Sequence, residues 1–315
     1  MQKTKLIIRN PLSLDGWLEF NAYKWGVKPS RLRVPEEGKE LPSAEVVLYT
    51  DSRGRIVQPP LNPYLPLVFH PTATVKTSRI YRQWTKISEL LVEQFIERGL
   101  KGSVAFPPEV MDVRQWQWNS FLAEVRYTFY IRLPYNLELA DLSQRSKARK
   151  AKKEGFSCEV AGSEAFRGVV ECMQDTGNRQ GFNYRLTHED LRNALTFLGE
   201  EVFHVYVCRS PSGEVASARV ALGAPGMIAM DWIAGTKREF LKSGVTQLLI
   251  AYELDHLSRL RIEVFDFVGA NLPTVSLAKA GWGGELVPYY VVRPINLRSL
   301  AALAARAVQF RWGKR

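Results

Sequence analysis

Cysteine and histidine are scarce in this chain. Its 315 residues include three cysteines and four histidines, and no two cysteines have the spacing Cys-x-x-Cys. Zinc sites and disulfide frameworks need such clusters. The sequence therefore predicts no metal site and reduced, unpaired thiols.

Long apolar runs are missing as well. No stretch approaches the roughly 18 apolar residues that a membrane-spanning helix requires. The first residues, MQKTKLIIRNPLSL, contain only three consecutive apolar residues, which is too few for the core of a signal peptide. We therefore expect a cytoplasmic protein.

Acidic residues are outnumbered by basic ones. Lys and Arg total 43 against 32 Asp and Glu, which gives a net charge of +11. This balance favours anionic partners, namely nucleic acid, phosphorylated molecules or an acidic membrane surface. It excludes none of the three.

Two segments that lack acids concentrate the positive charge. Residues 144–153 read QRSKARKAKK, and they predict a helix with a cationic face. Its candidate polyanion-binding residues are Arg145, Arg149, Lys152 and Lys153, although such a run can also be a plain solvated face. Residues 296–315 predict a basic amphipathic helix that either caps the core or rests on an anionic membrane as a peripheral contact.

An ordered pattern of elements occurs twice along the chain. Residues 44–58 and 202–222 each contain an apolar run, a turn signal (DSRG or SPSG) and a second run, as in a β-hairpin. A strand, a helix and another strand are predicted after each hairpin. The repetition predicts a duplicated α/β unit: residues 1–138 form one domain and 139–295 a second.

Residues 265–290, FDFVGANLPTVSLAKAGWGGELVPYY, carry a family resemblance. They resemble the C-terminal signature of Fem-type (FemAB-like) proteins in the GNAT acyltransferase superfamily, in which Phe-Asp-Phe-x-Gly precedes Phe-Lys-x-x-Phe-Gly. The matching residues are Phe265, Asp266, Phe267, Gly269, Lys279 and Gly283. Ala278 and Trp282 stand where the family has Phe. The segments RSKARKAKKEG and DVRQWQWNSFLAEVRYTFYIRL are also similar to family segments.

The resemblance implies a fold of class α/β (α+β), with tandem GNAT-like domains that are each a mixed twisted sheet flanked by helices. It also implies that the donor inserts where the strands MIAMDWI and RIEVFDF part. Coenzyme A users of the superfamily carry a glycine-rich turn before the next helix, whose backbone N–H groups hold pyrophosphate. Here KREFLKSGV has a single glycine, Gly244, so coenzyme A binding of the ordinary kind is not expected.

Acyl transfer to an amine needs a path for the amine proton and positive charge beside the developing oxyanion. The family position implies that Lys279 supplies the charge at the donor. On the neighbouring strand, Asp231 is the candidate for handling the proton. A covalent enzyme intermediate is not needed, which agrees with the lack of a Ser-His-Asp or Cys-His pattern.

Further candidates for substrate binding come from the same motif and from one loop. The motif contributes Asp266, Gly269, Asn271 and Trp282, although Asp266 could instead cap the GANLP turn. The loop TGNRQGFNYRLT contributes Arg179 and Arg185, which suit phosphate or carboxylate recognition.

Several functions remain open from the sequence. The first is an N-acyltransferase that uses aminoacyl-tRNA to extend a cell-wall precursor with an amine acceptor. The second uses an acyl thioester on coenzyme A or on an acidic acyl carrier protein. Neither binds a permanent cofactor. The alternative is a non-catalytic GNAT-fold protein that binds nucleic acid or another polyanion.

Overall fold

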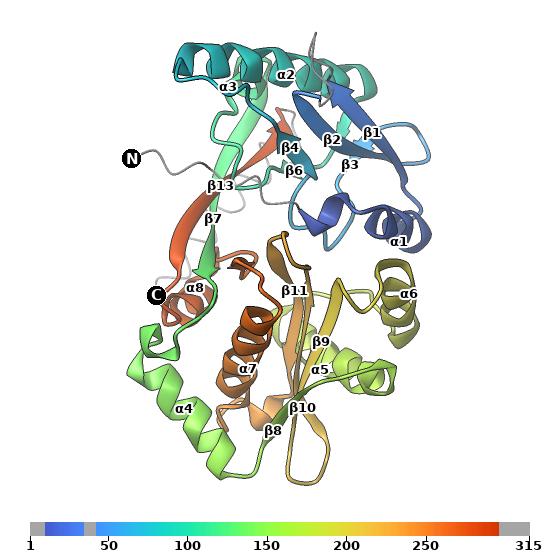
Figure 1. Ribbon diagram of the computed structural model, residues 1–315. Coiled ribbons are helices and arrows are strands. Elements are labelled where there is room, and N and C mark those ends of the chain that lie inside the picture. Colours follow the sequence, from blue (N-terminus) through green and yellow to red (C-terminus); the bar gives the residue numbers. More distant parts are fainter. Residues whose placement is uncertain (1–9, 35–41, 296–315) are drawn as a thin grey trace, which may run out of the picture. The chain divides into compact units, whose positions relative to one another are not determined.

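The computed structural model describes residues 10–34 and 42–295, which form helices and two mixed β-sheets (Figure 1). The chain divides into two compact units. Unit 1 contains the described residues up to Trp25 together with 61–63 and 127–287, and unit 2 contains 26–60, 64–126 and those from Pro288 onward. The expected 296–315 helix lies outside the described residues.

Unit 1 is built around a mixed sheet with the strand order β7-β12-β11-β10-β9-β8. Only the β11–β12 pairing in this series is parallel. The strands are β7 (Phe121–Arg132), β8 (Ser157–Val160), β9 (Phe203–Arg209), β10 (Val215–Leu222), β11 (Ala229–Thr236) and β12 (Val264–Asp266). Every residue of β10 is buried, as expected for a central strand covered on both faces.

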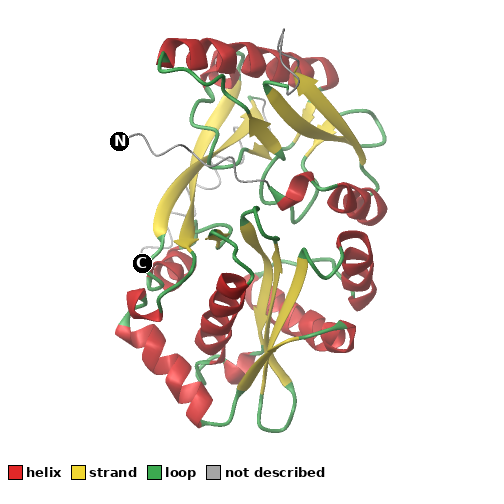
Figure 2. Ribbon diagram, in the orientation of Figure 1, coloured by secondary structure: helices red, strands yellow, loops and turns green. Residues whose placement is uncertain are grey.

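Helices flank this sheet (Figure 2). They are α1 (Asp15–Trp25), α4 (Leu142–Lys153), α5 (Phe166–Gln180), α6 (His188–Leu198), α7 (Val245–Arg259) and α8 (Pro273–Ala280), with short 3-10 turns η1 (Pro11–Ser13), η2 (Leu137–Leu139), η3 (Ser163–Ala165) and η4 (Arg238–Phe240). Helix α5 packs so closely on β11 that a Cβ on Gly235 would lie 2.4 Å from the carbonyl of Cys172. Helix α7 packs on β9 and β10 and is itself covered by α4.

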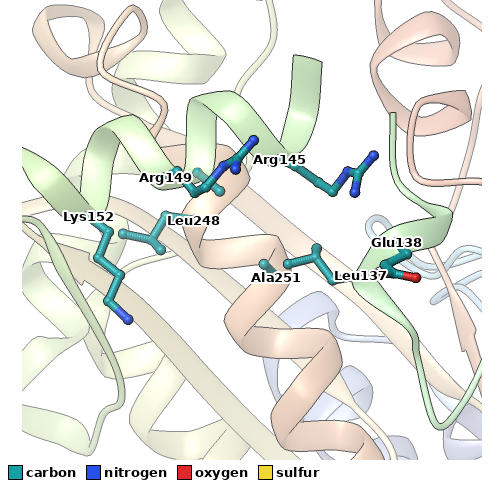
Figure 3. Close-up of a pocket in the computed structure, with 8 residues that line it drawn as sticks. Leu137, Glu138, Arg145, Arg149, Lys152, Leu248 and Ala251 are labelled. Carbon is teal, nitrogen blue, oxygen red and sulfur yellow. The ribbon is translucent and has the colours of Figure 1, made fainter. Parts of the chain in front are cut away.

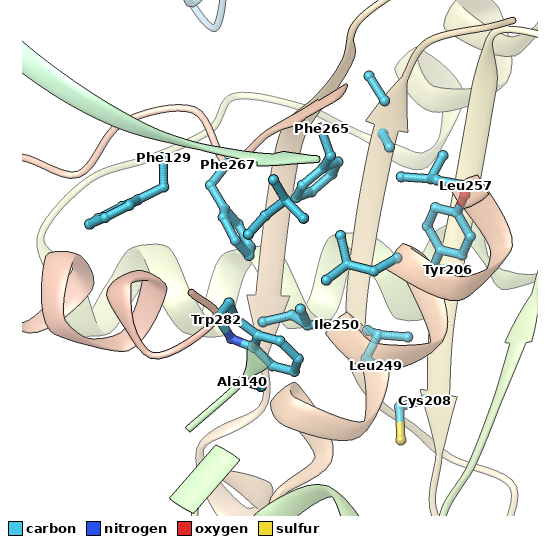
Figure 4. Packing of buried hydrophobic residues seen from close by; sticks show 14 of the residues in the cluster. Phe129, Ala140, Tyr206, Cys208, Leu249, Ile250, Leu257, Phe265, Phe267 and Trp282 are labelled. Carbon is cyan, nitrogen blue, oxygen red and sulfur yellow. The ribbon is translucent and has the colours of Figure 1, made fainter. Parts of the chain in front are cut away.

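Aromatic and aliphatic side chains from α7, β12 and the following loop fill the core of unit 1 (Figure 4). Phe265 and Phe267 meet edge to face with ring centroids 5.0 Å apart, which is a favoured aromatic geometry. Leu249 and Ile250 of α7 belong to the same cluster. Consequently, the FDF strand is anchored by its two phenylalanines.

The units do not follow the expected linear division at residue 138. Helix α1, from the beginning of the chain, packs in unit 1, where the ring of Trp17 meets Trp232 of β11 at 5.2 Å. Lys24 also forms an ion pair of 2.7 Å with Asp190 of α6. Strands β7 and β13 (Glu285–Pro294) each contain residues of both units. The division into these two units results from side-chain packing between segments that are far apart in the sequence. The order of elements along the chain does not reveal such packing.

Unit 2 contains a sheet with the strand order β1-β2-β3-β5, in which β4 pairs with β2. Its elements are β1 (Lys28–Val34), β2 (Ala44–Thr50), β3 (Ile56–Val57), β4 (Leu67–Phe69), α2 (Thr77–Arg98), β5 (Leu100–Lys101), β6 (Val104–Ala105) and α3 (Arg114–Trp118). Strand β6 pairs with β13. A separate core cluster, which includes Trp84, Phe95 and Trp116, fills this unit.

The expected duplication is present, but the two copies align differently from the sequence comparison. Strands β1, β2, β3 and β5 pair antiparallel, antiparallel and parallel, and β9, β10, β11 and β12 do the same. The hairpin at 44–58 thus corresponds to β10 and β11, whereas the sequence comparison matched it to 202–222. The mismatch arises because β1, KPSRLRV, is mostly polar and largely exposed, so it lacks the apolar pattern of a strand.

The N-terminus of α7 is covered by α4. Gly244 precedes α7 with φ +81, and a Cβ there would lie 2.2 Å from the carbonyl oxygen of Lys147 in α4. The ammonium of Lys150 donates to the carbonyl of Lys242 at 3.3 Å. The turn that precedes α7 is therefore packed against α4.

We expect Gly244→Ala to destabilise the protein more than Gly226→Ala. Both glycines have positive φ, but a Cβ on Gly226 would meet nothing within 4 Å. The control therefore carries only the backbone strain, while Gly244→Ala also displaces α4, at a further cost of about 1–3 kcal/mol. Urea unfolding of both variants measures this difference; equal losses would show that α4 does not pack tightly on this turn.

Candidate active site

Strands β11 and β12 part immediately after their only two paired positions in the described structure. Ala229 pairs with Phe265 and Met230 with Asp266. Strand β11 then continues to Thr236, whereas β12 ends at Asp266. Asp231 and Phe267 are therefore the first residues beyond the pairing, at the point where the sequence analysis expected the donor to insert.

A buried ion cluster lies at this point. The guanidinium of Arg219 on β10 donates to Asp231 on β11, and its Nε donates to Glu253 of α7 at 2.5 Å. The side chains of all three residues are at most 6% exposed. Within the described structure, the second oxygen of each carboxylate, Oδ1 of Asp231 and Oε1 of Glu253, has no hydrogen-bond partner.

Burial dominates the protonation of this cluster. It raises the pKa of Glu253 to about 8, against the opposing effect of Arg219. It also raises the pKa of Asp231, for the same reason. Two carboxylates share one guanidinium in a dry environment, so one of them retains a proton at neutral pH. With that one proton retained, the cluster of one guanidinium and two carboxyl groups carries no net charge.

Lys279 holds the loop that follows β12. Its ammonium donates to the carbonyl oxygens of Phe267 at 2.6 Å, Val268 at 3.0 Å and Gly269 at 2.7 Å. All three of its hydrogens are therefore used by backbone. Burial lowers its pKa to about 8. Lys279 thus lies beside the end of β12, where its ammonium fixes the loop instead of pointing to a free ligand site.

Three other motif residues also support this loop. Asp266 accepts from the hydroxyl of Thr128 at 2.5 Å and from the N–H of Val268 at 2.8 Å, which caps the turn as one of the two sequence interpretations supposed. Asn271 accepts from the N–H of Tyr127 at 2.9 Å. Gly269 has φ +79, a conformation that suits glycine.

Trp282 differs from its expected role in substrate binding. It is 1% exposed and belongs to the core cluster of unit 1, and its backbone carbonyl accepts from the hydroxyl of Tyr135 at 2.8 Å. A side chain that is enclosed by core residues cannot contact a substrate, so we correct its assignment to a packing residue.

The two loop arginines have different surroundings. Arg179 donates to the hydroxyl of Thr176 and to the carbonyl of Thr236, both at 2.8 Å, so it braces the end of β11. Arg185 is exposed, with φ +56. Between them in sequence, Tyr184 donates to the carbonyl of Ala234 at 3.0 Å. The loop therefore lies along the part of β11 that pairs with β10 but not with β12, and Arg185 is exposed in this loop.

A pocket of about 420 Å³ lies between α4 and α7 (Figure 3). Arg145, Arg149 and Lys152 line it, and Leu248 and Ala251 of α7 form part of its apolar wall. The structure thus brings together three of the four predicted polyanion-binding residues. The fourth, Lys153, is exposed on the same helix but does not line the pocket.

Comparisons with known proteins agree with this geometry. Residues 143–273, which include α4, the β8–β12 strands and α7, match the family described as acetyltransferase (GNAT) domain. This chain carries a GNAT acyltransferase domain. No curated protein matches the sequence.

Solved structures extend the similarity of fold to nearly the whole chain. A crystal structure of FemX is 15% identical, covers 95% of each chain and has a TM-score of 0.65. The C-terminal domain of a protein named as a lysylphosphatidylglycerol synthetase, from Agrobacterium fabrum, is 11% identical over 89% of this chain and 88% of that one, with a TM-score of 0.57. A tandem GNAT protein from the clavulanic acid pathway is 12% identical over 86% and 85%, with a TM-score of 0.50. The tandem GNAT fold is therefore confirmed.

Metal clusters and membrane-spanning helices are both absent from the described residues. Among them there is no group of three or more His, Cys, Asp or Glu side chains that could hold a metal ion. In the same part of the chain, every helix is too short or too polar to cross a bilayer.

Arg219 and Glu253 were missed by the sequence analysis. One signal was available: Arg219 interrupts the apolar run VASARVAL, and a charge on a buried strand needs a partner. Glu253 gave no such signal, because a glutamate within a helix is ordinarily exposed. Only the packing of α7 against β10 brings it to the arginine.

We expect Glu253→Gln to change how stability depends on pH. Burial raises the pKa of this carboxyl from 4.5 in the unfolded chain to about 8, so the folded protein retains a proton that the unfolded chain releases. Its contribution to stability is complete below about pH 4.5 and is lost as the pH rises through about 8. Glutamine, which mimics the protonated form, should make the free energy of unfolding fall less between pH 5 and pH 8.5.

The measurement is denaturant unfolding across that range, with the exposed Glu239→Gln on η4 as the control. If Glu253→Gln and the wild type differ by the same amount at pH 5 and pH 8.5, Glu253 is not protonated in the native cluster.

We also expect Lys279→Met to lower the free energy of unfolding by about 1–3 kcal/mol, because three loop carbonyls lose their donor. Lys153→Met, an exposed substitution, should change it by less than about 0.5 kcal/mol. Unfolding curves of the two variants decide the question. If Lys279→Met is as stable as the wild type, the lysine does not anchor this loop, and the role at the donor that the sequence suggested is the better interpretation.

Proposed function

We propose that this acyltransferase moves an aminoacyl group from aminoacyl-tRNA directly onto an amine of a cell-envelope precursor, where β11 and β12 part. The carrying observation is the covered N-terminus of α7 together with the separation of β11 from β12. The strand separation offers a place for the acyl group, whereas the covered turn lacks the usual place for coenzyme A.

Asp231 is the proposed proton acceptor. It lies at the first position beyond the paired part of β11 and β12. Arg219 holds one carboxylate oxygen, and the other has no partner in the described structure. The raised pKa brings this carboxyl closer to neutral pH, where a general base works best. As the amine attacks the ester carbonyl, Asp231 takes the proton of the amine; when the C–O bond of the ester breaks, Asp231 passes this proton to the ribose oxygen of the tRNA, which leaves as a hydroxyl.

Lys279 acts in this proposal as a positioning residue. By holding the carbonyls of residues 267–269, it fixes the wall opposite Asp231. Phe267 lies between the two cations, with its ring centroid 5.8 Å from both the Arg219 guanidinium and the Lys279 ammonium. The positive charge of Lys279 also stabilises negative charge on a nearby acyl oxygen by field alone.

The donor assignment rests on the turn before α7. In coenzyme A users that turn presents free backbone N–H groups to pyrophosphate. Here α4 is packed against it, with Gly244 in contact with the Lys147 carbonyl. A donor that needs no pyrophosphate site suits this arrangement, and the acyl ester at the end of tRNA is such a donor. An acyl carrier protein is the second candidate.

The names of the structural neighbours support an aminoacyl group and an envelope acceptor. One is FemX, and another is named for the synthesis of lysylphosphatidylglycerol, an aminoacylated phospholipid. The non-catalytic alternative receives no support from these comparisons. Arg185 is exposed in the loop that lies along β11, where β11 has left β12. It is the proposed contact for an acidic group of the acceptor.

The donor can be tested with labelled substrates. Purified protein would receive tRNA charged with radiolabelled amino acids, or radiolabelled acetyl-coenzyme A, with an extract of membrane lipids and cell-wall precursors as the acceptor. We expect label to move from tRNA to the acceptor and not from coenzyme A. Equal transfer from acetyl-coenzyme A would refute the donor assignment.

Asp231→Asn tests the proton path in the same assay. The amide retains the shape and an acceptor for Arg219 but cannot take a proton, so transfer should fall by about 100-fold or more. Asp255→Asn, an exposed substitution on α7, is the matched control and should transfer like the wild type. A normal rate for Asp231→Asn would exclude this residue as the base.

A further inference from the structure

Four exposed leucines lie on neighbouring segments of unit 1, at and beside the start of the cationic helix. Leu142, at the start of α4, is 66% exposed, and Leu277 of α8 is 75% exposed. Leu137 and Leu139, on η2, are exposed as well. A soluble monomer rarely exposes apolar side chains in a group unless they meet a partner.

Backbone contacts hold these leucines together. The N–H of Asp141, just before α4, donates to the carbonyl of Gly281, just after α8, at 2.8 Å. A Cβ on Gly283 would lie 2.6 Å from the carbonyl oxygen of Leu139. The end of α8, the turn η2 and the start of α4 are therefore in contact, and Figure 1 shows α8 next to the beginning of α4.

The same surface continues into a strongly basic helix. Residues 142–153 contain six cations and no acid, and five of the six are exposed. The six are Arg145, Lys147, Arg149, Lys150, Lys152 and Lys153. Only Lys150 has an ion-pair partner among the described residues, Glu154 at 3.7 Å. Glu138 and Asp141 lie beside the leucines, so cations still predominate by a wide margin.

We propose that the leucines 137, 139, 142 and 277 and the cations of α4 form a docking surface for an anionic lipid bilayer. The leucines enter the boundary between headgroups and acyl chains, and the cations meet the phosphates. This division of apolar and basic side chains is what peripheral membrane surfaces share. In this proposal the polyanion that the sequence predicted for α4 is a layer of lipid headgroups. Docking would also bring the β11–β12 site close to acceptors in the membrane.

Two other occupants fit less well. Bound RNA is held by cations together with aromatic rings that stack on its bases, whereas the apolar residues here are leucines. A second copy of the chain would bring two basic α4 helices together, and like charges repel. A bilayer is the partner that needs both the leucines and the cations.

The test is sedimentation of the full chain with vesicles of phosphatidylcholine alone or mixed with phosphatidylglycerol. It needs neither donor nor activity, so it can fail independently of the proposed function. We expect binding to the anionic vesicles that weakens with salt. Arg149→Glu with Lys152→Glu should reduce the affinity by at least about 30-fold, because each substitution replaces an attraction to the anionic lipids by a repulsion. Leu139→Ser with Leu142→Ser and Leu277→Ser should reduce it by at least about tenfold.

Matched controls come from unit 2. Arg79→Glu with Arg82→Glu changes exposed cations of α2, and Leu90→Ser with Ile96→Ser and Met111→Ser changes exposed apolar residues. Both controls should bind vesicles like the wild type. The proposal is overturned if the α4 and leucine variants bind vesicles normally. It is also overturned if the α4 variant loses only tRNA binding, or if the leucine variant loses only self-association measured by ultracentrifugation.

Discussion

The buried guanidinium of Arg219 is the interaction on which the site depends. It joins β10, β11 and α7 through Asp231 and Glu253 at the level where β11 leaves β12. Burying these charges is costly, and their mutual attraction repays it only while every partner is in place. Apolar residues could have filled the same volume. In the described structure one oxygen of each carboxylate has no hydrogen-bond partner, which agrees with the proposed transfer of a proton to Asp231.

The parting of two parallel strands creates this place. In a continuous sheet, the backbone of β11 beyond Met230 would be paired on both sides, whereas here its partner in the described structure is β10. Instead β12 ends at Asp266, and the loop after it is held by Lys279 and by the capping of Asp266. The capped loop cannot return to β11, so the strand separation is built into the fold. The same residues that resemble the family signature thereby act mainly by shaping the site.

Helix α4 connects the chemistry to its surroundings. It packs against α7 and the turn at Gly244, and five of its six cations are exposed. In the proposed function, the covered turn excludes an ordinary pyrophosphate site. In the proposed docking surface, the exposed cations of the same helix meet an anionic bilayer.

The sequence by itself determined the class of fold and pointed to the segments that form the candidate site. The FDF strand, the paired hairpins and the basic helix were readable because apolar periodicity and charge runs are local properties of the chain. It also pointed to Asp231, since a carboxylate in an apolar strand is conspicuous. The alignment of the two halves was wrong by one strand: the hairpin at 44–58 was matched to β9 and β10 instead of β10 and β11. The cause is the polar β1, which carries no such periodicity.

Tertiary structure alone decided what the side chains do. Trp282 became a core residue, Lys279 became the anchor of a loop, and Glu253 became a partner of Arg219, although 34 residues separate the last two in the chain. The same was true of α1, which packs in the unit formed mainly by the second half of the chain. Each of these outcomes depends on which distant segments meet and how much water their contact excludes. Those are properties of packing, and neither local pattern nor residue type contains them.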